Sequence, residues 1–251
     1  MTATAQRVAL VTGAGRGIGL ETARLLLAKG YRVAAVSREG VDPGILGGVR
    51  PELLCAAADV CDGAAMQELV ATLAHQWGPV SVLINNAGVS PKLADGSSAG
   101  ILQITPQEWA QVLEVNLTAV LRLCQLVLPG MCEQGFGRIV NVASLAGRTK
   151  SLVAGGSYMA SKAGLIGLTR AIATEMGPRG VTANAVAPGR ILTEMAQQAG
   201  LEVNQRYAAQ IPVRRLGTPE EVAAAMVFLA AEEAGFINGA ILDINGGFYM
   251  P

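Results

Sequence analysis

Aromatic and histidine residues are scarce in this chain of 251 residues, of which 4% are aromatic and only one, His75, is a histidine. Hydrophobic residues nevertheless make up 51%, so the core has to be built mainly from Val, Leu, Ile and Ala. Such side chains suit a parallel sheet that is buried on both faces. The segment around His75, MQELVATLAHQWG, predicts an exposed position on a helix rather than a catalytic base.

The chain also has no excess of charge of either sign, since it contains 19 basic and 19 acidic residues. A net charge of zero argues against nucleic acid as a main partner. No uninterrupted apolar run reaches the ~18 residues expected of a membrane span, and the start MTATAQR does not have the pattern of a signal peptide. We therefore expect a cytoplasmic protein with no membrane partner.

The four cysteines, Cys55, Cys61, Cys124 and Cys132, have no C-x2-C spacing. Because only one histidine could assist them, we predict no metal site and no disulfide framework, but buried, reduced thiols. Linkers rich in Pro, Gly or Ser and blocks of like charge are absent as well. Residues 1–251 are therefore predicted to form a single domain.

Short apolar segments alternate with helical segments along the chain. Strands are predicted at 7–12, 31–37, 52–57, 80–85, 137–143, 181–186 and 240–244. Two helices should begin alike, at Thr105-Pro106-Gln107-Glu108 and Thr218-Pro219-Glu220-Glu221, each with a threonine N-cap and a capping-box glutamate. The alternation predicts an α/β fold, a Rossmann-type doubly wound parallel sheet of about seven strands that binds ligands where the strand order reverses.

A glycine-rich turn follows the first predicted strand. Gly13, Gly17 and Gly19 have the spacing G-x3-G-x-G between an apolar run and a helical segment. Glycine allows a tight turn and close approach of the backbone to pyrophosphate, whose charge is favoured at a helix N-terminus. An ordinary β–α turn is the alternative, but this context favours a dinucleotide site.

Residues after the second strand bear on which dinucleotide binds. An acidic residue there binds the ribose of NAD, whereas an arginine accommodates the 2′-phosphate of NADP. This chain has Ser37 and Arg38, with Arg16 in the glycine turn as a second cation. NADP(H) is therefore favoured over NAD(H), although Glu39 could pair with Arg38 or repel a phosphate.

Tyr158 and Lys162 are four residues apart in the predicted helix GGSYMASKAGLIGLTRAIATEM. Residues i and i+4 share one face of a helix. A nearby cation lowers the pKa of a phenol from about 10 toward the range of a working general acid. The pair alone also fits a solvated helix face, so it needs support from elsewhere in the chain.

That support comes from seven segments, TGAGRGIG (12–19), ADV (58–60), NNAG (85–88), VN (115–116), VNVAS (140–144), YMASK (158–162) and NAVAPG (184–189). Their order and content resemble the short-chain dehydrogenases/reductases over nearly the whole chain. The tail LDINGGFYM resembles the branch that contains the bacterial 3-oxoacyl-[acyl-carrier-protein] reductases. The resemblance implies hydride transfer between a nicotinamide and a ketone or secondary alcohol.

The resemblance also implies roles for single residues. Tyr158 would exchange a proton with the substrate oxygen, and Ser144 would polarise that oxygen. Lys162 would lower the Tyr158 pKa and bond the nicotinamide ribose, while Asn116 would hold a water in a relay to Lys162. The implied cofactor-binding set is Gly13, Arg16, Gly17, Ile18, Gly19, Ser37, Arg38, Asp59, Val60, Asn86, Ala87, Gly88, Tyr158, Lys162, Pro188, Gly189, Ile191 and Thr193.

The substrate is less closely defined. Segment 191–216 resembles the variable substrate lid of the family, and the loop after NNAG is longer than expected for a carrier-protein reductase. Such a reductase needs cations near its mouth, for which Arg179, Arg214 and Arg215 are candidates, but Glu133 stands where that branch tends toward cations. We favour a small or medium ketone or hydroxy compound over an acyl carrier protein.

Two further alternatives are weighed. Enoyl reductases of the superfamily are expected to space tyrosine and lysine more widely, so reduction of C=O is favoured over C=C. A redox sensor or scaffold that binds NAD(P) without turnover would tend to have lost the four catalytic residues. The long apolar helices at 105–130 and 156–177 and the tail AILDINGGFYMP predict two kinds of two-fold contact, and hence a homotetramer.

Overall fold

The computed structural model describes residues 6–151, 153–197 and 201–251. Its sheet is parallel throughout, and its strands lie within two residues of the predicted ends at every position. They are β1 (Val8–Thr12), β2 (Arg32–Ser37), β3 (Leu53–Ala57), β4 (Val82–Asn85), β5 (Gly137–Val142), β6 (Val181–Pro188) and β7 (Ile241–Ile244). The order β3-β2-β1-β4-β5-β6-β7 reverses between β1 and β4, which confirms the doubly wound sheet.

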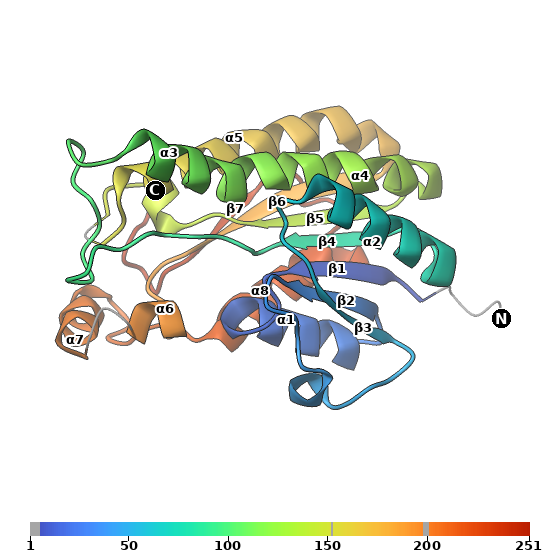
Figure 1. Ribbon diagram of the computed structural model, residues 1–251, viewed down its shortest axis with the longest axis horizontal. Coiled ribbons are helices and arrows are strands. Elements are labelled where there is room, and N and C mark those ends of the chain that lie inside the picture. Colours follow the sequence, from blue (N-terminus) through green and yellow to red (C-terminus); the bar gives the residue numbers. More distant parts are fainter. Residues whose placement is uncertain (1–5, 152, 198–200) are drawn as a thin grey trace.

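Helices cover both faces of the sheet (Figure 1). On one face lie α2, α4 and α5, and on the other lie α1 and α8. The bounds are α1 (Gly17–Ala28), α2 (Gly63–Trp77), α3 (Pro106–Leu113), α4 (Ala119–Gln134), α5 (Gly156–Met176), α6 (Glu194–Gln197), α7 (Leu201–Gln210) and α8 (Pro219–Ala230). Along β1, Val8 and Leu10 join one core while Ala9 and Val11 join the other, as a sheet buried on both faces requires.

Helices α3 and α4 belong to one continuous helix, joined by a π-helical stretch, η2 (Glu114–Thr118). Thr105 caps its start as predicted, since its hydroxyl accepts a hydrogen bond from the Glu108 backbone N–H (3.1 Å). The predicted capping box is wrong here, because the Glu108 carboxylate accepts from the Ser157 hydroxyl (2.7 Å) and so ties α3 to α5. At Thr218 both halves of the predicted capping box are present.

This helix, Pro106–Gln134, is long and apolar enough to cross a membrane by length and composition alone. In the fold, α4 packs on α2 and on β4 and β5, and 39% of the most apolar window of the helix is buried. Trp109 and Leu121 remain about two-fifths exposed. The helix therefore has a second apolar face that the chain itself does not cover.

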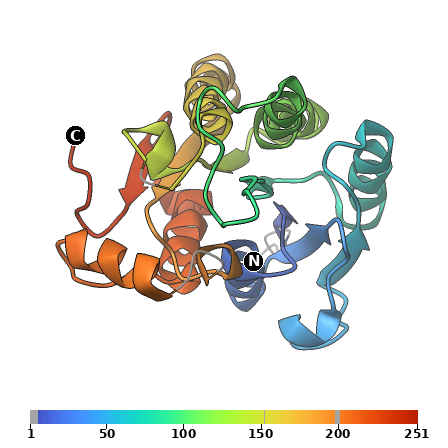
Figure 2. The same ribbon diagram turned by 60° about the vertical axis from the view of Figure 1, so that its left-hand side comes forward.

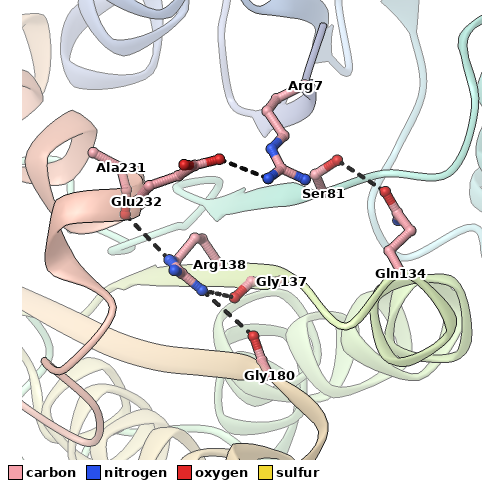
Figure 3. Close-up of polar contacts among 8 residues, drawn as sticks. All are labelled: Arg7, Ser81, Gln134, Gly137, Arg138, Gly180, Ala231 and Glu232. Atoms are coloured by element: carbon pink, nitrogen blue, oxygen red, sulfur yellow. Dashed lines mark hydrogen bonds and ion pairs between the residues drawn. The ribbon is translucent and has the colours of Figure 1, made fainter. Parts of the chain in front are cut away.

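Arginines occupy the edge of the sheet where the strands begin (Figure 3). Arg138 on β5 is only 6% exposed, and its Nε donates to the Ala231 carbonyl (3.2 Å). Arg7, just before β1, forms an ion pair with Glu232 (2.6 Å). Both guanidinium groups lie over the ring of Phe136, at 3.6 and 4.2 Å from its centroid. These contacts join the starts of β1 and β5 to the segment that follows α8.

All four cysteines are free thiols, as predicted. Only Cys124 is fully buried, so the expectation of buried thiols is wrong for Cys55, Cys61 and Cys132, which are partly exposed. Burial raises the pKa of Cys124 to about 12. This thiol therefore stays protonated and behaves as a small apolar side chain.

Candidate active site

The glycine turn between β1 and α1 has the shape that a pyrophosphate requires. Gly13 and Gly17 have φ values of +64° and +56°, which favour glycine. A Cβ at Gly19 would lie 2.2 Å from the Gly13 carbonyl oxygen, so the helix can approach the turn only without a side chain there. No side chain caps the start of α1 at Arg16, which leaves backbone N–H groups at the helix N-terminus for an anion.

The ends of β1 and β4 are tied together at the point where the strand order reverses. The Asn86 side-chain amide donates to the carbonyls of Thr12 (2.9 Å) and Gly13 (3.1 Å). In return the Thr12 hydroxyl accepts from the backbone N–H groups of Asn86 and Ala87, each at 3.1 Å. Thr12 was not among the predicted site residues, although a hydroxyl at the last position of a strand could have indicated it. The structure uses Asn86 to hold the glycine turn, and its contact with a ribose stays a prediction.

A cleft of about 640 Å³ follows this edge of the sheet. Among the predicted cofactor residues, it is lined by Gly13, Arg16, Gly17, Ile18, Ser37, Arg38, Asp59, Val60, Asn86, Ala87, Gly88, Tyr158, Lys162 and Thr193. Gly19 lies behind the turn, and Pro188, Gly189 and Ile191 line a neighbouring cavity instead. Asp59 also accepts from the Cys61 backbone N–H (2.9 Å), so it shapes its own turn. The set fits an extended dinucleotide.

The two arginines expected at a 2′-phosphate both have carboxylate neighbours. Arg38 lies 3.7 Å from Glu39, and Arg16 lies 3.0 Å from Glu194. All four side chains are more than 60% exposed. Exposed pairs of this kind are worth at most about 1 kcal/mol, so a bound phosphate can compete for either arginine.

Tyr158 and Lys162 lie together on α5 as predicted, with the Lys162 Nζ 5.6 Å from the centroid of the phenol ring. The ammonium donates to the Val142 carbonyl (2.7 Å), and burial lowers the pKa of Lys162 to about 8. Burial raises the pKa of Tyr158, while a hydrogen bond with the Ser144 side chain opposes that rise. Burial thus disfavours the charged form of both groups, and the lowering of the Tyr158 pKa by Lys162 stays a prediction.

Ser144 lies two residues after the end of β5, where its Oγ accepts from the Ala146 backbone N–H (3.1 Å). Asn116 lies in the π-helical stretch η2 and is fully buried. Its amide exchanges two hydrogen bonds with the Val89 backbone (2.8 and 3.0 Å) and donates to the Ser161 hydroxyl (3.0 Å). π-Helical turns are frequent at functional sites.

Asn116 and Lys162 both face the backbone at Gly88. A Cβ at Gly88 would lie 3.2 Å from the Asn116 Oδ1 and 3.4 Å from the Lys162 Nζ. The two polar side chains are therefore close neighbours on the same side of this glycine. A water relay between them stays a prediction, since protein groups bond both ends of the Asn116 amide.

A second cavity of about 500 Å³ adjoins the cleft. Tyr158 lines both of them, and Ser144 lines the second. The loop after β4 and the α6–α7 region, which face the viewer in Figure 2, supply much of its wall. Sequence reasoning missed three cations in this wall, Lys92, Lys150 and Arg190, because no local pattern marks a side chain that faces a cavity.

The predicted lid, 191–216, contributes Ile191, Thr193, Ala196 and Tyr207 to the second cavity. Tyr207 is 7% exposed and stacks on Phe248 of the C-terminal tail, with centroids 5.1 Å apart. Residues 198–200 of this segment lie outside the described residues. The described part of the segment is therefore anchored through an aromatic contact to the tail.

The cations expected at the mouth for an acidic partner are placed differently. Arg179 lies two residues before the start of β6 and so at the starting edge of the sheet, away from the two cavities; the expectation of a cation at the mouth is wrong for Arg179. Glu133, near the end of α4, lies at the same edge. Arg215 forms two hydrogen bonds with the Glu221 carboxylate (2.8 and 2.6 Å), and Arg214 donates to the Ala209 carbonyl.

A dinucleotide cleft that meets a second cavity at a tyrosine, with a lysine and a serine beside it, defines the class of NAD(P)-dependent oxidoreductases. A family model described as Enoyl-(Acyl carrier protein) reductase matches residues 13–249. The chain belongs to the short-chain dehydrogenase/reductase family, and it is an oxidoreductase of that family.

Individual relatives align over nearly their whole length. An acetoacetyl-CoA reductase of Rhizobium meliloti is 41% identical over 97% of this chain and 99% of its own. A 3-oxoacyl-[acyl-carrier-protein] reductase of Vibrio cholerae is 39% identical over 97% of this chain and 98% of its own. The crystal structure of a 3-oxoacyl-[acyl-carrier protein] reductase with bound NAD from Brucella melitensis is 35% identical, covers 98% of this chain and 92% of that chain, and has a TM-score of 0.86.

Proposed function

We propose that the protein is an NADP(H)-preferring carbonyl reductase and alcohol dehydrogenase for a small or medium substrate. The observation that carries this proposal is the position of Tyr158, which lines the dinucleotide cleft and the second cavity at their junction. A bound nicotinamide supplies the hydride chemistry at this junction. Tyr158 then holds the proton that a ketone oxygen takes up, and Ser144 donates a hydrogen bond to the same oxygen.

The Tyr158–Lys162 arrangement explains how a proton can move at this site. Burial raises the pKa of Tyr158, so the phenol stays protonated until the ketone oxygen takes up its proton. With a pKa lowered to about 8, Lys162 is poised to release or accept a proton near neutral pH. Lys162 lies beside Tyr158 and Gly88, and we expect its ammonium to donate a hydrogen bond to the nicotinamide ribose there.

NADP(H) preference is part of the proposal. Ser37 lies at the end of β2 where a carboxylate would favour NAD, and Arg38 and Arg16 line the same part of the cleft. Each arginine has only an exposed carboxylate neighbour, which a phosphate dianion can replace. Glu39 and Glu194 weaken this preference without reversing it.

Reduction of a 3-oxoacyl thioester is the second candidate, favoured by the names of the relatives. The x3 spacing of Tyr158 and Lys162 agrees with C=O rather than C=C reduction. An acyl carrier protein is the less favoured partner, because Arg215 is already bonded to Glu221 and Arg179 lies at the opposite edge of the sheet.

A turnover assay tests the proposal. Purified protein is mixed with NADPH or NADH and with aromatic ketones, diketones, sugars, acetoacetyl-CoA and an acetoacetyl-carrier protein, and oxidation of the cofactor is followed at 340 nm. We expect multiple turnovers with NADPH and a small or medium carbonyl compound. Tight NADPH binding without turnover of any substrate would identify a sensor or scaffold instead.

We also propose a homotetramer, consistent with two separate apolar surfaces. One lies on α3 and α4 and includes Trp109 and Leu121, and the other includes Phe236, Leu242 and Met250 near β7 and the tail. Two distinct two-fold contacts produce a tetramer. Light scattering at micromolar concentration should give about four times the chain mass of 25.8 kDa. A stable, fully active monomer would contradict this.

A further inference from the structure

Two cations in the second cavity have no carboxylate partner among the residues that the structure describes, and the first is Lys92. It lies in the loop between β4 and α3, among the residues that line the cavity beside Tyr158. Its ammonium donates to the Ser98 hydroxyl (2.9 Å) and to the Val153 carbonyl. Both acceptors are neutral, so they orient the ammonium without cancelling its charge.

The second cation is Arg190, which follows Gly189 at the end of β6 and is half-buried. Its Nε and Nη2 donate to the Asn204 Oδ1 (3.0 and 2.9 Å), and Nη2 donates also to the Ala196 carbonyl (3.0 Å). Asn204 is itself only 8% exposed. The guanidinium is therefore held rigidly by neutral groups, and its Nη1 is not used by any described residue.

The charge balance of the cavity is one-sided. Among the described residues that line it, three are cations, Lys92, Lys150 and Arg190, and Asp95 is the one carboxylate. The Asp95 carboxylate accepts from the Ser97 backbone N–H (2.9 Å), and no described carboxylate lies within ion-pair distance of Lys92 or Arg190. Burial and the charge of Arg190 lower the pKa of Lys92, as expected for two cations that repel one another.

Several other arginines of the chain have a carboxylate partner. Arg7, Arg16, Arg24, Arg148 and Arg215 each have a carboxylate partner at 3.0 Å or less. Two unpaired cations in a partly enclosed cavity produce a positive potential that attracts anions and favours their binding. The same cavity contains Ser144 and Tyr158, where the reacting oxygen is expected.

Resting on the proposed function, we propose that the substrate carries a carboxylate, held by Lys92 and Arg190 while its keto or hydroxyl group lies at Ser144 and Tyr158. The substrate class is thus a free oxo acid or hydroxy acid. A cavity of about 500 Å³ has room for such a molecule. Arginine suits a carboxylate because its planar group offers parallel donors. A phosphate on a carrier thioester shares this anionic chemistry and is a separate arm of the test.

The experiment compares acids with their own neutral esters. Wild-type protein and NADP+ are given 2-, 3- and 4-hydroxy acids and the methyl ester of each, and kcat/KM is measured for each member of a pair. We expect the best acid to exceed its ester by about ten- to hundredfold, the value of one charge-assisted hydrogen bond. Added salt should raise KM for the acid more than for the ester.

Variants locate the effect. In Lys92→Met the ratio of acid to ester in kcat/KM should fall by about tenfold or more, mostly through KM, and Lys92→Arg should restore most of it. Arg190→Gln should lower the same ratio. The matched control is Lys29→Met, which removes an exposed lysine that lines neither cavity and should leave the ratio unchanged.

Each outcome decides the question. A wild-type protein that oxidises esters as well as acids overturns the carboxylate, yet leaves the proposed oxidoreductase intact. Equal loss for acid and ester in Lys92→Met also overturns it, since Lys92 would then only hold the loop at Val153. A preference for acetoacetyl-CoA over a thioester without phosphate, lost in Lys92→Met, assigns the cations to a phosphate. Turnover of none of these compounds overturns this inference, and the proposed function is overturned as well only if the ketones, diketones and sugars of the turnover assay are not converted either.

Discussion

The two edges of the sheet both carry cations, but they treat them in opposite ways. At the starting edge, Arg7 pairs with Glu232, and the charge of the same glutamate also acts on Arg138, which donates to the Ala231 carbonyl (Figure 3). At the other edge, Lys162 is buried, and among the described residues the neutral Val142 carbonyl is its one acceptor. Cations that lie near a carboxylate keep their charge and bind strands together, whereas a buried cation without a counter-charge is unstable in its charged form and responds to a ligand. The comparison distinguishes a structural edge, where the strands begin, from a chemical edge, where the strands end and the two cavities lie.

The largest effect should come from the chemical edge. Tyr158→Phe removes the hydroxyl that donates the proton, so turnover should fall by about 10²–10⁴-fold. NADPH affinity should fall by far less, because most of the cleft is unchanged. Stopped-flow turnover and fluorescence titration with NADPH measure the two quantities. Near-normal activity would show that Tyr158 is not the proton donor.

A smaller effect is expected at the exposed end of the cleft. Arg38→Ala should weaken NADPH by about ten- to hundredfold and NADH by much less, since a charge-assisted bond to the 2′-phosphate is lost. Titration of each cofactor against wild type and variant gives the comparison. If both cofactors weaken equally, or wild type prefers NADH, the NADP assignment is wrong.

The buried lysine should appear in the pH dependence of stability. The pKa of Lys162 is about 8 in the folded chain, against an ordinary value of 10.5. Between these values the unfolded chain binds more protons, so the free energy of unfolding rises with pH. Between pH 8 and 10 we expect wild type to gain about 2 kcal/mol relative to Lys162→Met. Urea unfolding at several pH values measures the difference, and parallel curves would contradict a lowered pKa.

A substitution at the structural edge should lower the stability of the protein and leave its activity unchanged. Arg138→Met leaves backbone carbonyls such as that of Ala231 without their donor, and the free energy of unfolding should fall by about 1–2 kcal/mol. Because Arg138 lies far from both cavities, kcat/KM should be unchanged. Arg7→Met, which breaks an ion pair with a largely exposed glutamate, should cost less than about 1 kcal/mol. A loss of activity in Arg138→Met at temperatures where it stays folded would break the distinction between the edges.

Features that depend on near neighbours in the chain could be predicted. The strands could be located because apolar, β-branched runs end at glycine or polar residues, and the caps at Thr105 and Thr218 because threonine, proline and glutamate occur in a fixed order. The Tyr158–Lys162 contact followed from helical spacing alone. Even here, the Glu108 carboxylate does not complete the predicted capping box, because it accepts a hydrogen bond from Ser157, a residue that is distant in sequence.

Features that depend on burial and on distant segments could not be predicted. The sequence by itself determined the parallel sheet, the glycine turn and the positions of the catalytic candidates, because local backbone preference and periodicity decide them. Only the tertiary structure decided that burial raises the Tyr158 pKa, and that Lys92 and Arg190 line one cavity without a carboxylate partner. The physical reason is that desolvation and Coulomb energy depend on the groups that surround a charge in space, and separation along the chain does not contain that information.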